Sequence, residues 1–74
     1  MNQHEDFLEG FGDALGLRVE IDSALIQAHY RVWLAGSGMN TAERTDYESG
    51  GYETGLETGA EYRRGTQEWP LNAL

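Results

Sequence analysis

Carboxylates are the most numerous chemically active side chains of this sequence, and many of them recur at every fourth residue. The chain of 74 residues has 13 acidic residues, set against 5 arginines and no lysine. Helix positions four residues apart lie on one side at intervals of about 6 Å, so acids at this spacing form a row of negative charge. The predicted rows comprise Glu5, Glu9 and Asp13, and then Glu43, Asp46, Glu53, Glu57 and Glu61.

Paired carboxylates can act in acid–base catalysis, but only where a pocket separates their pKa values. Exposed glutamates on a helix do not provide such a pocket. His4 and His29 stand in no recognised metal-ligand spacing. A set of Ser23, His29 and Asp22 lacks the sequence context of an activated nucleophile. The sequence therefore predicts no catalytic residues, and we do not expect an enzyme.

The segment from Asp46 to Glu57 resembles an EF-hand calcium loop. Asp46 stands at position one, Gly51 at the glycine position and Glu57 at position twelve. However, Gly50 offers no ligand at position five, and Glu53 replaces the usual apolar residue at position eight. We interpret the segment as part of a solvated acidic helix, and predict neither a metal site nor a cofactor.

The net charge limits the kinds of partner that the chain can have. A formal charge of -8 repels nucleic acid phosphates and anionic membranes, which argues against direct binding to either. Basic proteins are the natural targets of such a surface. Cysteine is absent, and the N-terminal segment has no basic region followed by an apolar run. We expect one small domain, 1–74, in the cytoplasm.

Hydrophobic periodicity predicts a mainly α fold, a small three-helix domain with an irregular C-terminal tail. The predicted helices cover about residues 3–15, 23–35 and 41–64. Phe7, Leu8 and Phe11 form the apolar face of the first helix. The middle of the chain also alternates apolar and polar residues as a strand does, so an α+β fold with a hairpin in 17–34 is the alternative.

The predicted middle helix has apolar residues on two sides. Ile26, Tyr30 and Trp33 fall on one side, and Leu25 and Val32 fall on another. A helix that is apolar on two sides is typical of a central, buried position. We therefore expect the other helices to pack around it.

The predicted final helix, 41–64, combines an acidic stripe with a row of glycines. Asn40 and Glu43 have the spacing of a capping box at its start, and Gly50-Gly51 is where we most expect it to break. Glycines at every fourth residue permit close approach of two helices, either within the chain or between two copies. Candidate helix-packing residues are Gly51, Gly55, Gly59, Tyr52 and Leu56. In the tail, Trp69, Leu71 and Leu74 are predicted to cover the core.

Small size, lysine-poor acidity and carboxylate rows together make the chain similar to a class of bacteriophage anti-defence proteins, which includes anti-CRISPR and anti-restriction proteins. Some members of that class resemble nucleic acid electrostatically and occupy the basic channel of a defence complex. The resemblance implies a viral inhibitor, a DNA mimic that acts in the host cytoplasm to evade host defence. Its implied target is a basic protein or ribonucleoprotein complex, such as a nuclease or a CRISPR effector.

The leading hypothesis is therefore a non-enzymatic inhibitor that blocks nucleic-acid access to its target. Its partner-binding residues are the eight carboxylates of the predicted rows. The competing hypothesis is a structural or adaptor protein, a homodimer formed through the helix face of Gly51, Gly55 and Gly59.

Overall fold

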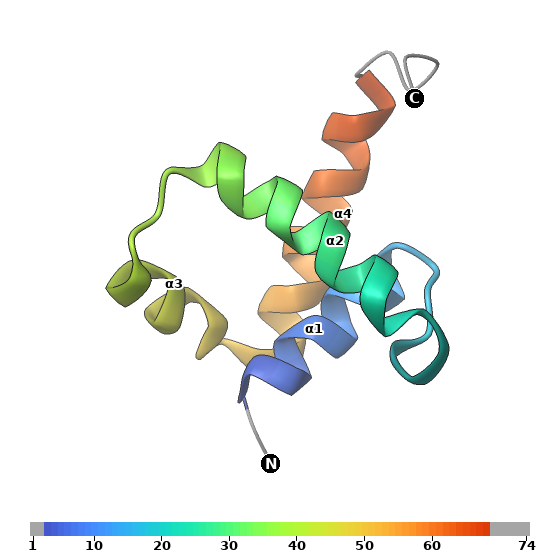
Figure 1. Ribbon diagram of the computed structural model, residues 1–74, viewed down its shortest axis with the longest axis horizontal. Helices are drawn as coiled ribbons and strands as arrows, with labels where there is room; N and C mark the ends of the chain where they lie inside the picture. The colour runs from blue at the N-terminus through green and yellow to red at the C-terminus, as the bar shows by residue number, and fades with distance from the viewer. Residues whose placement is uncertain (1–2, 69–74) are drawn as a thin grey trace.

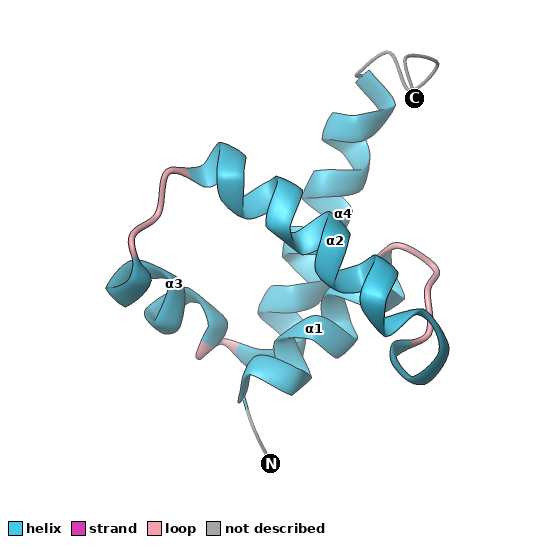
Figure 2. Cartoon of the chain, viewed as in Figure 1, coloured by secondary structure: helices cyan, strands magenta, loops and turns pink. Residues whose placement is uncertain are grey.

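A computed structural model describes residues 3–68, and this part of the chain is helical apart from three short connections (Figure 2). The helices are α1 (Gln3–Ala14), α2 (Val19–Ser37), α3 (Thr41–Glu48) and α4 (Gly51–Glu68). The mainly α prediction is confirmed. The hairpin alternative in 17–34 is wrong, because α2 spans most of that segment. Trp69, Leu71 and Leu74 lie outside the described residues.

Glycines bring α1 and α4 into direct backbone contact, and α1 packs more extensively on α4 than on any other helix (Figure 1). A Cβ atom at Gly10 would lie 2.1 Å from the carbonyl oxygen of Tyr52. One at Gly55 would lie 2.0 Å from the carbonyl oxygen of Phe7, and Gly59 also faces α1. No side chain fits at these positions without separating the helices. The glycine row of α4 therefore packs within the chain.

The core lies where α1 meets α2 and α4. Phe7 and Phe11 are fully buried, and the Tyr30 ring lies 5.1 Å from Phe7 and 5.5 Å from Phe11 between centroids. Ile26 approaches Gly12, where a Cβ atom would lie 2.6 Å from its Cδ1 atom. These contacts confirm the predicted apolar faces of the first two helices.

Helix α2 covers one side of this core and is open on the other. It begins at Val19, four residues before the predicted start, and is kinked at Asp22, whose carboxylate accepts a hydrogen bond from the Arg18 backbone N–H at 3.1 Å. Leu25 is 47% exposed and Val32 is 44% exposed. The prediction of a central helix buried on two sides is therefore wrong. In so short a chain, the other helices pack on only one side of α2.

The predicted helix 41–64 is divided into α3 and α4 at the expected position. Gly51 has φ +69°, in the left-handed region that favours glycine, so the chain turns there instead of continuing as a helix. At the start of α3, the Asn40 side chain accepts from Glu43 N–H and the Glu43 carboxylate accepts from Asn40 N–H, which confirms the capping box. Figure 1 shows that the axes of α3 and α4 point in different directions.

We expect Gly55→Ala to lower the free energy of unfolding by about 2–3 kcal/mol, because the added methyl group would overlap the α1 backbone. Gly65→Ala is the matched control within the same helix. No described atom lies within 4 Å of a Cβ there, so this change should raise stability by about 1 kcal/mol through helix propensity. Urea unfolding followed by circular dichroism measures both effects. Equal effects of the two substitutions would contradict the close approach of α1 and α4.

Candidate partner-binding surface

All eight carboxylates of the predicted rows are exposed. They belong to three helices, with Glu5, Glu9 and Asp13 on α1, Glu43 and Asp46 on α3, and Glu53, Glu57 and Glu61 on α4. The continuous stripe of five carboxylates predicted for 41–64 is wrong. The turn at Gly51 separates the α3 pair from the α4 row, because positions before and after the turn no longer share one helical axis.

The α1 row is the most acidic of the three groups. Glu5, Glu9 and Asp13 point away from the buried Phe7 and Phe11, and α1 contains no arginine or lysine. A hydrogen bond from the Tyr52 hydroxyl to the Asp13 carboxylate at 2.6 Å joins the end of the row to α4. This hydrogen bond, with smaller effects of burial and of the nearby Asp13 and Glu9 charges, raises the pKa of Tyr52.

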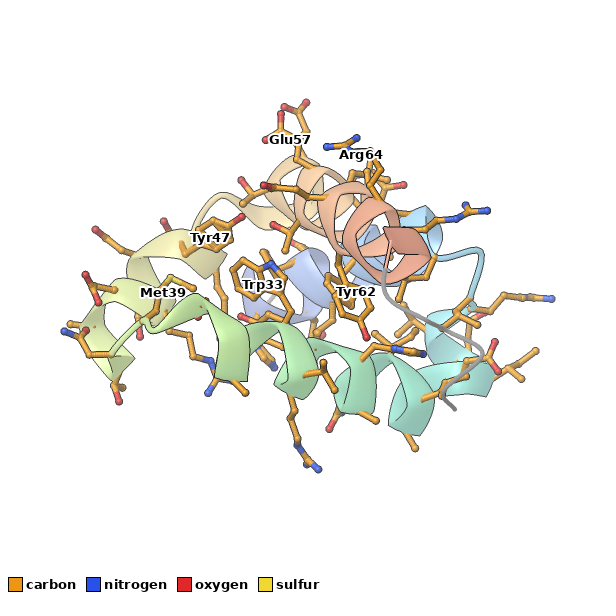
Figure 3. All side chains as sticks on the ribbon, turned by 90° about the horizontal axis from the view of Figure 1, so that it is seen from above. Trp33, Met39, Tyr47, Glu57, Tyr62 and Arg64 are labelled. Carbon is orange, nitrogen blue, oxygen red and sulfur yellow. The ribbon has the colours of Figure 1, made fainter. Side chains whose placement is uncertain are left out.

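The α4 row lies on the side of α4 opposite the glycines that contact α1. Glu57 stands about 200° around the helix from Gly55, which directs it into solvent. Figure 3 shows Glu57 and Arg64 pointing outward together, on the side of α4 turned away from α2. Helix α4 also carries Arg63 and Arg64, whereas α1 has no arginine or lysine, so the net charge of α4 is less negative than that of α1.

The arginines that form ion pairs do so with other carboxylates. Among the described residues, Arg18 pairs with Glu20 at 3.5 Å, Arg44 pairs with Glu48 at 2.8 Å, and His4 approaches Glu48 at 2.8 Å. None of the eight row carboxylates takes part in these pairs. The rows therefore present negative charge that the described part of the chain does not neutralise by contact.

The predicted helix-packing residues have different surroundings. Gly55 and Gly59 are buried against α1, whereas Gly51, with its positive φ, turns the chain at the first residue of α4. Tyr52 is 39% exposed, and Leu56 is half-buried. A homodimer through this glycine face, as in the adaptor hypothesis, would require α1 to leave its place, because α1 already covers Gly55 and Gly59.

Sequence reasoning missed the buried carboxylate of Glu48, which is only 9% exposed. It accepts hydrogen bonds from the Tyr30 hydroxyl at 2.5 Å and from Arg44 Nε at 2.8 Å, and His4 Nδ1 lies 2.8 Å away. Glu48 thereby connects α3 to α1 and α2. The only signal in the sequence was the i,i+4 spacing of Arg44 and Glu48, which by itself indicates a weak surface pair.

The surroundings of Glu48 shift its titration and that of its partners. Burial alone would raise the pKa of Glu48, but hydrogen bonds from Tyr30, Arg44 and His4 outweigh it and hold the pKa below its ordinary value. Burial and the hydrogen bond to Glu48 raise the pKa of Tyr30. The hydrogen bond to Glu48 raises the pKa of Arg44. Glu48 is therefore ionised at neutral pH, with its charge offset by Arg44.

The described residues contain no cluster of three or more His, Asp or Glu side chains that fits a metal ion. The segment from Asp46 to Glu57 is helical except for its turn, so its carboxylates do not converge as in a calcium loop. His29 Nδ1 lies 2.8 Å from the Tyr62 hydroxyl, an interaction that joins α2 to α4. None of the described helices has the length and apolar character needed to span a membrane.

Comparisons with protein-family models, with curated proteins and with solved structures find no match to this chain. The interpretation of the surface therefore depends on its own geometry and charge.

We expect Glu48→Gln to lower the free energy of unfolding at pH 7 by about 1–2 kcal/mol, because the charged hydrogen bonds to Glu48 are lost. The loss is no larger because Arg44 is partly exposed, so water screens its interaction with Glu48. The pKa of Glu48 is lower in the folded protein than in the unfolded chain. The stability that ionised Glu48 contributes to the fold is therefore fully present above the ordinary pKa of 4.5, and it is lost as the pH falls through the lower pKa of the folded protein.

Urea unfolding between pH 7 and pH 3 measures this linkage. The loss of stability on acidification should be smaller in Glu48→Gln than in the unmodified protein. Glu20→Gln is the matched control, because the Glu20 side chain is 73% exposed and pairs only with Arg18 at the surface. Parallel stability curves for the unmodified protein and Glu48→Gln would show that Glu48 does not have the assigned role.

Proposed function

We propose that this chain is a non-enzymatic inhibitor that binds a basic nucleic-acid-handling protein or ribonucleoprotein complex and blocks the access of nucleic acid. The observation that supports this proposal is the set of exposed carboxylate rows without ion pairs in the described part of the chain. Unneutralised charge of one sign costs stability through self-repulsion. A positively charged partner would relieve that repulsion on binding.

The spacing of the rows suits a surface that binds phosphates. Carboxylates four residues apart on a helix recur about every 6 Å, which is similar in scale to successive phosphates along a nucleic acid strand. Arginine pairs with carboxylate and with phosphate through the same planar, two-pronged geometry. A groove of arginines that holds nucleic acid can therefore accept such a helix in its place. The proposed targets are nucleases and CRISPR effector-like complexes, with the chain acting as a phage anti-defence protein.

Within this proposal, the α1 row is the main contact. It carries three carboxylates at four-residue spacing and lies on a helix without arginine or lysine, and Asp13 at its end is held by the Tyr52 hydroxyl of α4. The α4 row shares its helix with Arg63 and Arg64 and therefore attracts a basic surface less strongly. The α3 carboxylates add to the long-range field that accelerates association.

Charge reversal on matched pairs of residues tests which row makes the contact. We expect the double variant Glu5→Lys, Glu9→Lys to bind the basic target protein at least tenfold more weakly than the unmodified chain. The double variant Glu53→Lys, Glu57→Lys should weaken this binding less. Both double variants change the net charge equally, so a difference between them reports the position of the charges. Affinities from biolayer interferometry, with helix content checked by circular dichroism, measure the effect. Equal losses would show that net charge alone governs binding.

Salt and nucleic acid should both compete with binding. Immobilised protein is expected to capture a basic nuclease or RNA-guided complex from a bacterial lysate at low salt, and raising NaCl from about 0.05 to 0.3 M should weaken that complex at least tenfold. The purified target should lose its nucleic acid as the inhibitor is added, in a fluorescence anisotropy titration. A captured target that binds inhibitor and nucleic acid at the same time would overturn the proposal of blocked access.

A further inference from the structure

A groove of about 520 Å³ lies between the C-terminal halves of α2 and α4, on a different part of the surface from the α1 row. Its lining includes Val32, Trp33, Met39, Tyr47, Tyr62 and Glu61. Figure 3 shows Trp33 on α2, Tyr47 on α3 and Tyr62 on α4 around this opening, whereas Glu57 and Arg64 point away from it. The groove is therefore aromatic, and three helices contribute to its walls.

The two tyrosines present their rings to the groove, because their hydroxyl groups have partners inside the protein. The Tyr47 hydroxyl lies 2.5 Å from the Thr58 hydroxyl, and the Tyr62 hydroxyl lies 2.8 Å from His29 Nδ1. Trp33 stacks on Tyr47 with 5.2 Å between ring centroids. These contacts fix the rings in place, so the groove is formed before any partner arrives.

Two helical glycines that line the groove make no close contact with the described residues. Gly10, Gly55 and Gly59 are each required by a close contact with backbone atoms, but no described atom lies within 4 Å of a Cβ added to Gly36 or Gly65. Glycine weakens a helix relative to alanine, and Gly65 lies inside α4. Any larger residue at these positions would project into the groove. The absence of side chains at these two positions keeps the groove open.

Among the groove-lining residues that the structure describes, Glu61 is the one that carries a charge. It is exposed, and it has no ion pair or hydrogen bond among the described residues. The groove thus combines aromatic walls with one free carboxylate at its edge. An arginine side chain matches this combination, because its apolar stem packs on rings while its planar guanidinium stacks on aromatics and pairs with a carboxylate.

We propose that the groove binds an arginine side chain of the basic partner, with the stem against Trp33 and Tyr62 and the guanidinium paired with Glu61. This inference rests on the proposed function, and adds to it an anchoring site that is distinct from the α1 row and uses Glu61, the last carboxylate of the α4 row. Arginine is enriched among residues that dominate binding energy in such pockets, whereas exposed charge pairs contribute mainly to association rate. Lysine lacks the planar group and fits the site less well.

The test is an NMR titration of the full chain with an acetylated, amidated hexa-arginine peptide, with hexa-lysine as the comparison. Arginine should shift the indole N–H signal of Trp33 and the backbone signals of Glu61 and Tyr62, and lysine should shift them less. Gly65→Leu and Gly36→Leu fill the groove at two independent positions where the added side chain meets open space. Each should abolish the groove shifts and weaken hexa-arginine binding about tenfold.

Two further variants serve as controls. Ala28→Leu adds the same side chain on the exposed outer side of α2 and should leave binding unchanged. Glu61→Gln should reduce the preference for arginine while leaving the groove open. Unchanged groove shifts in both glycine variants would overturn the proposal.

The outcomes separate failure of the groove from failure of the proposed function. Shifts at Glu5 and Glu9 without shifts at Trp33 would leave the charge rows as the binding surface and reject the groove. No shift at either place would reject both. If the NMR signals of the groove residues shift with protein concentration in the absence of peptide, and sedimentation shows dimers, the groove binds a second copy of the chain. If removal of residues 69–74 shifts the Trp33 signal in the absence of peptide, the groove binds the chain's own C-terminal segment.

Discussion

The backbones of α1 and α4 lie against each other without side chains between them, and the rest of the structure depends on this contact. Gly10 faces the carbonyl of Tyr52, and Gly55 faces the carbonyl of Phe7. Close backbone approach supports many dispersion contacts and weak Cα–H···O interactions in a small volume. A chain of 74 residues can bury only a small core, so this compact pairing supplies stability that a larger protein would obtain from more side chains.

The same contact explains where the charge lies. With α1 covered by α4 on one side and by α2 on another, the remaining side of α1 carries Glu5, Glu9 and Asp13. On α4, the glycine side is used for packing, which leaves Glu53 and Glu57 on the opposite side. Glu48 is the exception: it is buried and is stabilised by Tyr30 and Arg44. The molecule thus buries Glu48 as part of its own structure and exposes the row carboxylates.

Local patterns in the sequence predicted much of the fold, and long-range contacts account for what was missed. The faces of Phe7 and Ile26, the Asn40 capping box and the break at Gly50-Gly51 depend on neighbouring residues, and all were predictable. The continuity of the acidic stripe was not, because it depended on the backbone angle of Gly51. The role of Glu48 was also missed, since its partner His4 is 44 residues away in the chain. Exposure of the row carboxylates was implied by amphipathic spacing, but only the structure shows that they form no ion pairs with the described residues.

Helices α1 and α4 meet through their glycines, and nuclear Overhauser effects between backbone protons report this contact. An added Cβ at Gly55 would lie 2.9 Å from the Phe11 backbone nitrogen, and one at Gly10 would lie 2.8 Å from that of Leu56. If the two backbones are in contact, strong cross-peaks should join the Gly55 Hα protons to the Phe11 amide proton, and the Gly10 Hα protons to the Leu56 amide proton. Absence of both cross-peaks in a well-folded sample would contradict the close approach of α1 and α4.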